Sequence, residues 1–217
     1  MKLSITTLLT GLAIASASPI ERETYPTHAP HHLFTRQDVQ TSINASLPNV
    51  TIFATGGTIA SQGSSNTQTV GYSIGLGVEA LIDAVPEILN ISNIAGYQTS
   101  NVGSGSINET ISLALAHGIT AELAKDEVSG VVVTHGTDSL EETAFFLQMT
   151  INSTKPVVVV GAMRPATALS ADGPLNLLQA VTLASSDNAK GRGVMISLNE
   201  YVSYNHTCNR HPAIRAR

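Results

Sequence analysis

Two threonine-bearing loops, each at the end of an apolar run, carry the side chains of this chain that are best suited to chemistry. Thr55-Gly56-Gly57-Thr58 follows the run 50–54, and His135-Gly136-Thr137-Asp138 follows a run that ends at residue 134. A hydroxyl group can act as a nucleophile once a neighbouring group takes its proton, and an acid beside it can assist. These residue types in both loops point to covalent attack by a threonine.

The elements around these loops predict where they lie. An apolar run of four or five residues indicates a buried parallel strand, and glycine then allows a tight turn. In open α/β sheets, ligands bind beyond the carboxyl ends of the strands. The whole pattern predicts an α/β domain with a doubly wound, mainly parallel sheet. The expected strands are 50–54, 94–101, 131–134, 157–160 and 194–198, and the expected helices are 78–84, 107–123, 140–149 and 175–184, the last with Ser170 or Asp172 as N-cap.

Three blocks in fixed order resemble the bacterial-type (type II-like) L-asparaginases, and the chain looks like a secreted, fungal-like member. They are Thr55-Gly56-Gly57-Thr58-Ile59-Ala60, then His135 to Ala144, then Gly161-Ala162-Met163-Arg164-Pro165 with Ser170 to Pro174. The likeness runs from about Asn49 to about Glu200. It implies an amidohydrolase that converts L-asparagine to L-aspartate and ammonia through a threonine nucleophile, without a cofactor or a metal. It also implies a homotetramer.

The resemblance assigns roles to particular residues. It implies that Thr55 is the nucleophile, that Tyr72 lies near it on a flexible loop (61–75), and that Thr137 is the second catalytic threonine. Asp138 would act beside Thr137 and bind the substrate α-amino group. Ser104 would bind the α-carboxylate, and Gly103 and Thr137 would be further substrate-binding residues. From position alone, Thr55 and Ser104 could equally be polar turn residues, and Asp138 a helix-terminal acid.

Two features depart from that family. Gly105 stands where members usually carry Gln or Glu, which leaves the choice between asparagine and glutamine open. Residues 201–217 contain no lysine to complete the expected Thr-Asp-Lys relay, and the family's smaller C-terminal domain does not follow. We therefore expected residues 49–200 to be the N-terminal α/β domain, 201–217 to be an aberrant tail outside the family, and the chain to be catalytically impaired as given.

The N-terminus predicts export. Lys2, an apolar stretch over 8–14 and Ala15-Ser16-Ala17 form a secretory signal over residues 1–17, with an extended leader over 18–48. Export to an extracellular, cell-wall or periplasm-like space is supported by possible N-glycosylation at six N-x-[ST] sites: Asn44, Asn49, Asn90, Asn108, Asn152 and Asn205. No later segment is long and apolar enough to span a membrane.

Composition and spacing exclude other classes. A net charge of −5 and 12% charged residues do not suit a nucleic-acid surface. The histidines of the leader (His28, His31, His32) and the tail set His206, Cys208 and His211 lack a metal-site framework. A dinucleotide-binding oxidoreductase needs a glycine spacing that Ala60 and Gln62 break. A secreted, non-catalytic amino-acid binder or inactive paralogue stays open as an alternative, as does a glutaminase-asparaginase.

Overall fold

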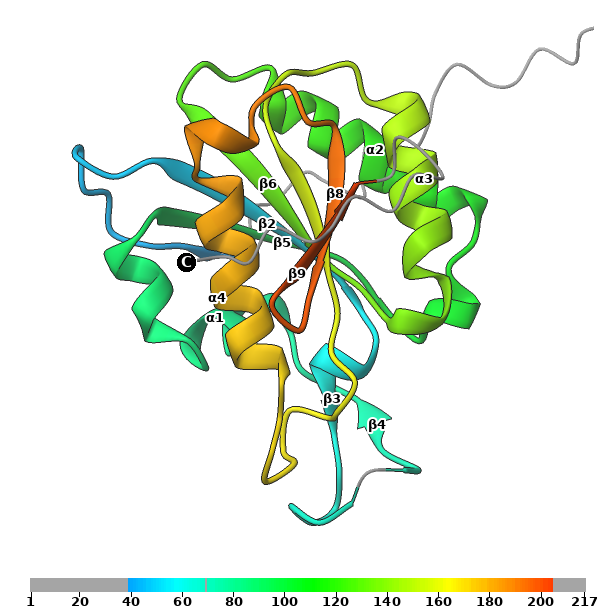
Figure 1. Cartoon of the computed structure of the whole chain (residues 1–217). Coiled ribbons are helices and arrows are strands. Elements are labelled where there is room, and N and C mark those ends of the chain that lie inside the picture. Colours follow the sequence, from blue (N-terminus) through cyan, green and yellow to red (C-terminus); the bar gives the residue numbers. More distant parts are fainter. Residues whose placement is uncertain (1–38, 69, 205–217) are drawn as a thin grey trace, which may run out of the picture.

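The computed structural model describes residues 39–68 and 70–204, and its centre is a seven-stranded sheet (Figure 1). The strand order is β1-β5-β2-β6-β7-β8-β9, in which β5, β2, β6, β7 and β8 are parallel and the two edge strands pair antiparallel. This mainly parallel sheet confirms the predicted α/β class. The strands are β1 (Val39–Gln40), β2 (Asn49–Gly56), β5 (Asn93–Val102), β6 (Val128–Thr134), β7 (Val157–Val160), β8 (Val194–Leu198) and β9 (Tyr201–Tyr204).

Helices cover both faces of the sheet. The pair α1 (Val78–Asp83) and α4 (Gly173–Ala184) packs on one face, and the pair α2 (Glu109–Leu123) and α3 (Leu140–Thr150) packs on the other (Figure 1). Alternate strand residues feed the two cores, since Ile52 faces α1 and α4 while Phe53 faces α2 and α3. Burial on both faces is why these strands read as continuous apolar runs.

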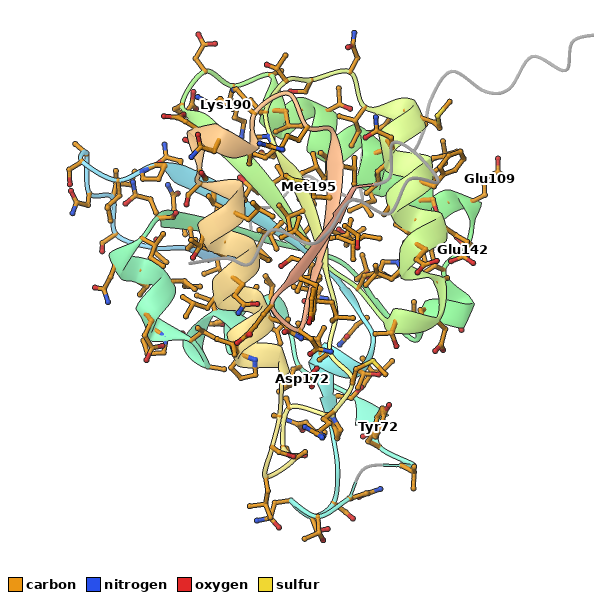
Figure 2. The ribbon with its side chains drawn as sticks, in the orientation of Figure 1. Tyr72, Glu109, Glu142, Asp172, Lys190 and Met195 are labelled. Carbon is orange, nitrogen blue, oxygen red and sulfur yellow. The ribbon has the colours of Figure 1, made fainter. Side chains whose placement is uncertain are left out.

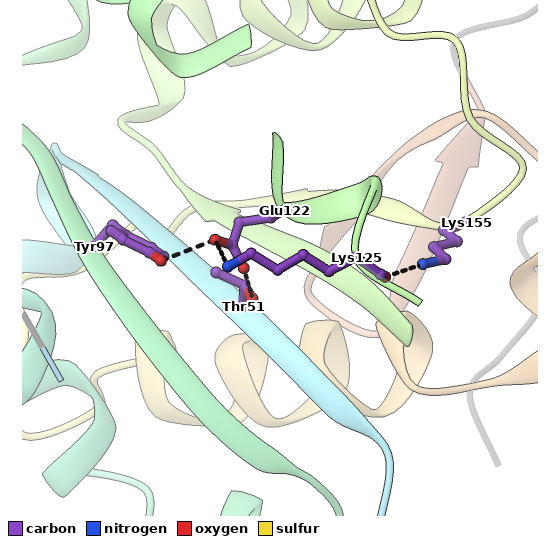
Figure 3. Close-up of polar contacts among 5 residues, drawn as sticks. All are labelled: Thr51, Tyr97, Glu122, Lys125 and Lys155. Atoms are coloured by element: carbon purple, nitrogen blue, oxygen red, sulfur yellow. Dashed lines mark hydrogen bonds and ion pairs between the residues drawn. The ribbon is translucent and has the colours of Figure 1, made fainter. Parts of the chain in front are cut away.

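A buried carboxylate fixes α2 to the sheet. Glu122, only 6% exposed, accepts hydrogen bonds from the hydroxyls of Tyr97 on β5 (2.8 Å) and Thr51 on β2 (3.1 Å) (Figure 3). Lys125 completes the cluster as an ion pair with Glu122, and Lys155 donates to the carbonyl oxygen of Lys125. Both buried hydroxyls depend on this one carboxylate, so Glu122 ties the C-terminal end of α2 to two central strands.

Short elements complete the fold. A two-stranded hairpin is formed by β3 (Ser61–Gln62) and β4 (Ser73–Ile74). The 3-10 turns are η2 (Thr58–Ala60), η3 (Pro86–Asn90), η4 (Ser104–Ser106), η5 (Thr137–Ser139) and η6 (Asp187–Ala189). Within the part of the chain that the structure describes, no helix has the length and apolar character needed to cross a membrane.

The predicted elements are all present, with differences at their ends. β7 and β8 have the predicted bounds, whereas β2 continues to Gly56 and so includes Thr55. Residues 39–40 of the expected leader and 201–204 of the expected tail form the edge strands β1 and β9. The signal segment, the leader and tail histidines, Cys208 and the Asn205 site lie outside the described residues.

Candidate active site

Three turns meet at one edge of the sheet. Because β5, β2 and β6 are neighbours and parallel, the turns that follow them, η4, η2 and η5, lie side by side at their carboxyl ends. Gly57 and Gly136 bring two of these turns into backbone contact, since a Cβ built on Gly57 would lie 2.3 Å from Gly136 Cα. Gly57 also has a φ of +81°, which side-chain-bearing residues rarely adopt. The sequence therefore needs glycine for this approach.

Ser104 joins the η4 turn to the η5 turn. It is 5% exposed, its Oγ accepts the backbone N–H of Asp138 (3.1 Å), and its carbonyl oxygen accepts the hydroxyl of Ser139 (2.8 Å). The hydroxyl of Ser104 thus keeps its own hydrogen for an acceptor. Gly103, in extended backbone, leads into the η4 turn. The structure therefore brings Gly103 and Ser104 to the Thr137-Asp138 turn, as the predicted substrate site requires.

Thr137 and Asp138 face outward from the same place. Thr137 is half-buried and Asp138 is exposed, and both belong to the η5 turn that precedes α3. A carboxylate next to a serine hydroxyl offers an acceptor and a donor a short distance apart. Such a pair can bind the ammonium and carboxylate groups of an amino acid at once.

The two threonines of the first loop lie in different environments. Thr55 is 1% exposed, and its hydroxyl donates to the carbonyl oxygen of Thr134 (2.9 Å) inside the sheet. Thr58 is half-buried, and its Oγ1 lies 3.0 Å from the hydroxyl oxygen of Tyr72. We expect Tyr72 near Thr55, and its hydroxyl in fact meets Thr58, further along the same loop. The role of Thr55 as nucleophile stays a prediction, and its hydroxyl must leave the Thr134 carbonyl group before it can attack a substrate.

Tyr72 reaches the site from the β3–β4 hairpin. The pairing of Gln62 with Ser73 and of Ser61 with Ile74 sets the position of the residue before β4. Figure 2 shows Tyr72 on this part of the chain, which projects from the body of the domain. Two residues 14 positions apart, Thr58 and Tyr72, thereby present adjacent hydroxyl groups.

His135 is a site residue whose role the sequence reasoning missed. Its ring is fully buried, with Nδ1 2.8 Å from the carbonyl oxygen of Gly136 and Nε2 3.0 Å from Thr143 Oγ1. Burial lowers the pKa of His135, so the ring is neutral at pH 7, with Nδ1–H donating to Gly136 and Nε2 accepting from Thr143. The signal that could have identified His135 from the sequence is its position at the start of the second block that resembles the asparaginases. The ring links the η5 turn to α3.

Metal ligands do not gather in this region. Across residues 39–68 and 70–204, no group of three or more His, Cys, Asp or Glu side chains could hold a metal ion. The side chains that the structure brings together at the three turns include hydroxyl groups and a carboxylate.

Comparison with known proteins places this chain in a family. A family model described as the N-terminal part of asparaginase matches residues 49–214, which extends beyond residue 200, where we expected the likeness to end. "Probable L-asparaginase 1" of Schizosaccharomyces pombe is 62% identical over 162 residues, covering 74% of this chain and 45% of that protein. "L-asparaginase 2" of Bacillus subtilis is 55% identical over 158 residues, covering 72% and 42%. The "glutaminase-asparaginase" of Acinetobacter glutaminasificans is 52% identical over 155 residues, covering 71% and 47%.

A solved structure is similar over the same region. The "probable cytoplasmic L-asparaginase" from Campylobacter jejuni superposes with a TM-score of 0.71 at 45% identity, over 73% of this chain and 48% of that one. The chain spans about half the length of the curated relatives it matches (45% and 42% for two of them). The chain belongs to the asparaginase family and carries the family's N-terminal domain.

Proposed function

We propose that this domain carries the nucleophile and the substrate-binding residues of an amidohydrolase that converts L-asparagine to L-aspartate and ammonia. One observation carries the proposal: the loop of Thr55 and Thr58, which the Tyr72 hydroxyl contacts, lies on the same sheet edge as the Ser104–Asp138 pair. A nucleophile next to a site for an amino acid suits attack on the amide of that amino acid. The names of the relatives, all asparaginases, point to the same reaction.

Thr55 is the nucleophile of this proposal, as the resemblance implies. Its hydroxyl leaves the Thr134 carbonyl oxygen, and its Oγ1 attacks the side-chain amide carbon of asparagine. The threonine proton passes through the hydroxyl groups of the site to the amide nitrogen, and the tetrahedral intermediate expels ammonia, which leaves an aspartyl ester on Thr55. Water then attacks the ester carbonyl, releases aspartate and restores the threonine hydroxyl. Two moderate barriers replace the large barrier of direct amide hydrolysis.

Asp138 and Ser104 orient the substrate for that attack. The exposed carboxylate of Asp138 binds the α-ammonium group, and the free hydroxyl hydrogen of Ser104 binds the α-carboxylate. Thr137, beside Asp138, is the second hydroxyl of the site and supports proton transfer in the later step. Binding both charged groups fixes the side-chain amide near the η2 turn.

The proposal is tested by adding L-asparagine to the purified chain and measuring ammonia and aspartate together. We expect equal amounts of both products, released slowly because residues 201–217 supply no lysine to the expected relay. A non-catalytic amino-acid binder would bind aspartate in a calorimeter and release no ammonia from asparagine. That combination of results would contradict the enzymatic proposal while leaving the binding site intact.

A broader substrate range has one observation in its favour. A Cβ at Gly105 would meet no atom within 4 Å, so the space beside Ser104 is open on that side. Glutamine is one methylene longer than asparagine and needs such room. The test compares the ratio of kcat/KM for asparagine to kcat/KM for glutamine in the wild type with the same ratio in Gly105→Gln. An unchanged ratio would show that this position does not set substrate preference.

We also propose that the chain is exported and glycosylated. The side chains of Asn44, Asn90, Asn108 and Asn152 are exposed, as an attached glycan requires. Asn49 is different, because its Nδ2 donates to the carbonyl oxygen of Glu127 (3.0 Å) within the fold. Expression through a eukaryotic secretory pathway should give glycans at the four exposed sites, mapped by peptide mass spectrometry. Retention in the cytoplasm without glycans would contradict the proposal.

A further inference from the structure

The third sequence block has no part in the proposed reaction. It forms most of the segment between β7 and α4, residues 161–172, which we call the β7–α4 arm. Figure 1 shows this arm projecting from the same edge of the sheet as the β3–β4 hairpin, residues 61–74, and beside it. The arm therefore lies next to the hairpin that carries Tyr72.

Three hydrogen bonds join the arm to the hairpin. Gly63 N donates to Thr167 Oγ1 (2.8 Å), Ala166 N donates to the Ser61 carbonyl oxygen (2.9 Å), and Leu169 N donates to the Asn66 carbonyl oxygen (3.0 Å). The contacts begin at Ser61 in β3 and continue outward along the hairpin. The arm therefore follows the side of the hairpin instead of touching it at one point.

The strand pairing within the hairpin is short. Its own pairing covers two residues on each strand, Ser61–Gln62 with Ser73–Ile74. Most of the described residues between these strands are exposed, among them Val70, whose side chain is 78% exposed. A two-residue ladder is too short to be stable alone, so the position of Tyr72 depends on what the hairpin contacts.

The arm is well anchored by comparison. Both carboxylate oxygens of Asp172 accept backbone N–H groups, from Met163 (2.8 Å) and Arg164 (2.9 Å), which closes the base of the arm. Arg164 also donates to the carbonyl oxygen of Ser170 (3.0 Å), and Asn176 Nδ2 donates to Asp172 (3.2 Å). Figure 2 shows Asp172 where the arm joins α4. Asp172 occupies the N-cap position, as one of the two predicted caps, but its side chain binds the arm and makes no capping hydrogen bond.

We propose that the β7–α4 arm positions the Tyr72 hydroxyl beside the loop that carries the nucleophile Thr55, and that Thr167 is a positioning residue that acts through Tyr72. The arm holds the hairpin at the place where the Tyr72 hydroxyl lies 3.0 Å from Thr58 Oγ1 in that loop. Of the three links, the Thr167 hydroxyl is the one made by a side chain, so it can be removed without altering the backbone. This inference rests on the proposed function, since the value of the position comes from the reaction at Thr55.

The experiment uses the full chain and five variants, one of which is Tyr72→Phe alone. Thr167→Val removes the acceptor and keeps the shape, and Thr167→Ser restores the acceptor. Thr182→Val is the matched control, because Thr182 is also exposed and its hydroxyl bonds only to Leu178 within α4. Thr167→Val is then combined with Tyr72→Phe to test whether Thr167 acts through the tyrosine.

Two measurements distinguish the effect of the arm on the hairpin from its effect on catalysis. Hydrogen exchange at the Gly63 amide should become about five-fold faster in Thr167→Val, as expected for loss of one hydrogen bond, and should be normal in Thr167→Ser and Thr182→Val. The kcat for asparagine should fall by a similar factor, about five-fold, with a smaller change in KM because Ser104 and Asp138 lie on other turns. In the Tyr72→Phe background, Thr167→Val should lower kcat no further.

Unchanged exchange at Gly63 would overturn the proposal. An equal loss of kcat with and without the Tyr72 hydroxyl would overturn the action through Tyr72. If the wild type itself releases no ammonia, the proposed function fails, and the exchange result alone decides whether the arm holds the hairpin.

Discussion

Replacing Gly57 by alanine should lower both the free energy of unfolding and the affinity of the site for L-aspartate. A Cβ at this position would lie 2.3 Å from both Gly136 Cα and Gly136 N, far inside van der Waals contact. The backbone at Gly57, with φ 81° and ψ −172°, is in a region that is nearly exclusive to glycine and costs other residues about 1–3 kcal/mol. Overlap with a backbone that must move adds about 1–3 kcal/mol. The free energy of unfolding should therefore fall by about 2–6 kcal/mol.

Gly191→Ala is the matched control. Gly191 also has a positive φ, 74°, but a Cβ there would meet no atom within 4 Å. Gly191→Ala should lower the free energy of unfolding by about 1 kcal/mol, through its backbone conformation alone. Urea unfolding gives both values, and calorimetric titration with L-aspartate at low temperature should show lost affinity in Gly57→Ala and normal affinity in Gly191→Ala. Equal stability losses and equal aspartate affinities in the two variants would refute the reasoning that contact between the η2 and η5 turns builds the site.

Three further substitutions test other parts of the structure. Asp138→Asn keeps the size of the side chain and removes its charge, so aspartate affinity measured by calorimetry should fall by at least tenfold, a loss of about 1.5–3 kcal/mol, with little change in stability; unchanged affinity would contradict the ammonium-binding role. Glu122→Ala removes the carboxylate to which two buried hydroxyls donate, so it should lower the free energy of unfolding in urea by about 2–5 kcal/mol. Lys125→Ala should lower it by less than about 1 kcal/mol, because the Lys125 side chain is 44% exposed. Similar losses in the two variants would show that the ion pair dominates. Because burial lowers the pKa of His135, the unfolded state binds the proton first as pH falls below about 6.5, so stability should decrease there and the decrease should be smaller in His135→Gln; an identical pH dependence in both proteins would contradict the neutral ring.

The sequence predicted the central elements well because their signals are local. Four consecutive valines at 157–160 can be buried on both faces only as an inner strand, and β7 has those bounds. The edge strand β9 escaped prediction because Tyr201–Tyr204 is placed by pairing with β8, which no pattern inside the segment reveals. The short β3–β4 pairing was missed for the same reason.

The sequence predicts which turns form the site, but not the hydrogen bonds within them. β2 continues through Thr55 to Gly56, beyond the expected end of the strand at residue 54, so the Thr55 hydroxyl donates to the Thr134 carbonyl oxygen. The contact between Thr58 and Tyr72 also depends on a hairpin register that the sequence does not specify.

The identity of the nucleophile is the central claim, and trapping the ester intermediate tests it most directly. The full chain is mixed with L-asparagine, quenched in acid within milliseconds, digested and analysed by mass spectrometry, with Thr58→Ala and Thr55→Ala treated in parallel. We predict an aspartyl ester on Thr55 that is absent from Thr55→Ala and still forms in Thr58→Ala. An ester on Thr58, or ammonia release by Thr55→Ala at the wild-type rate, would contradict the account.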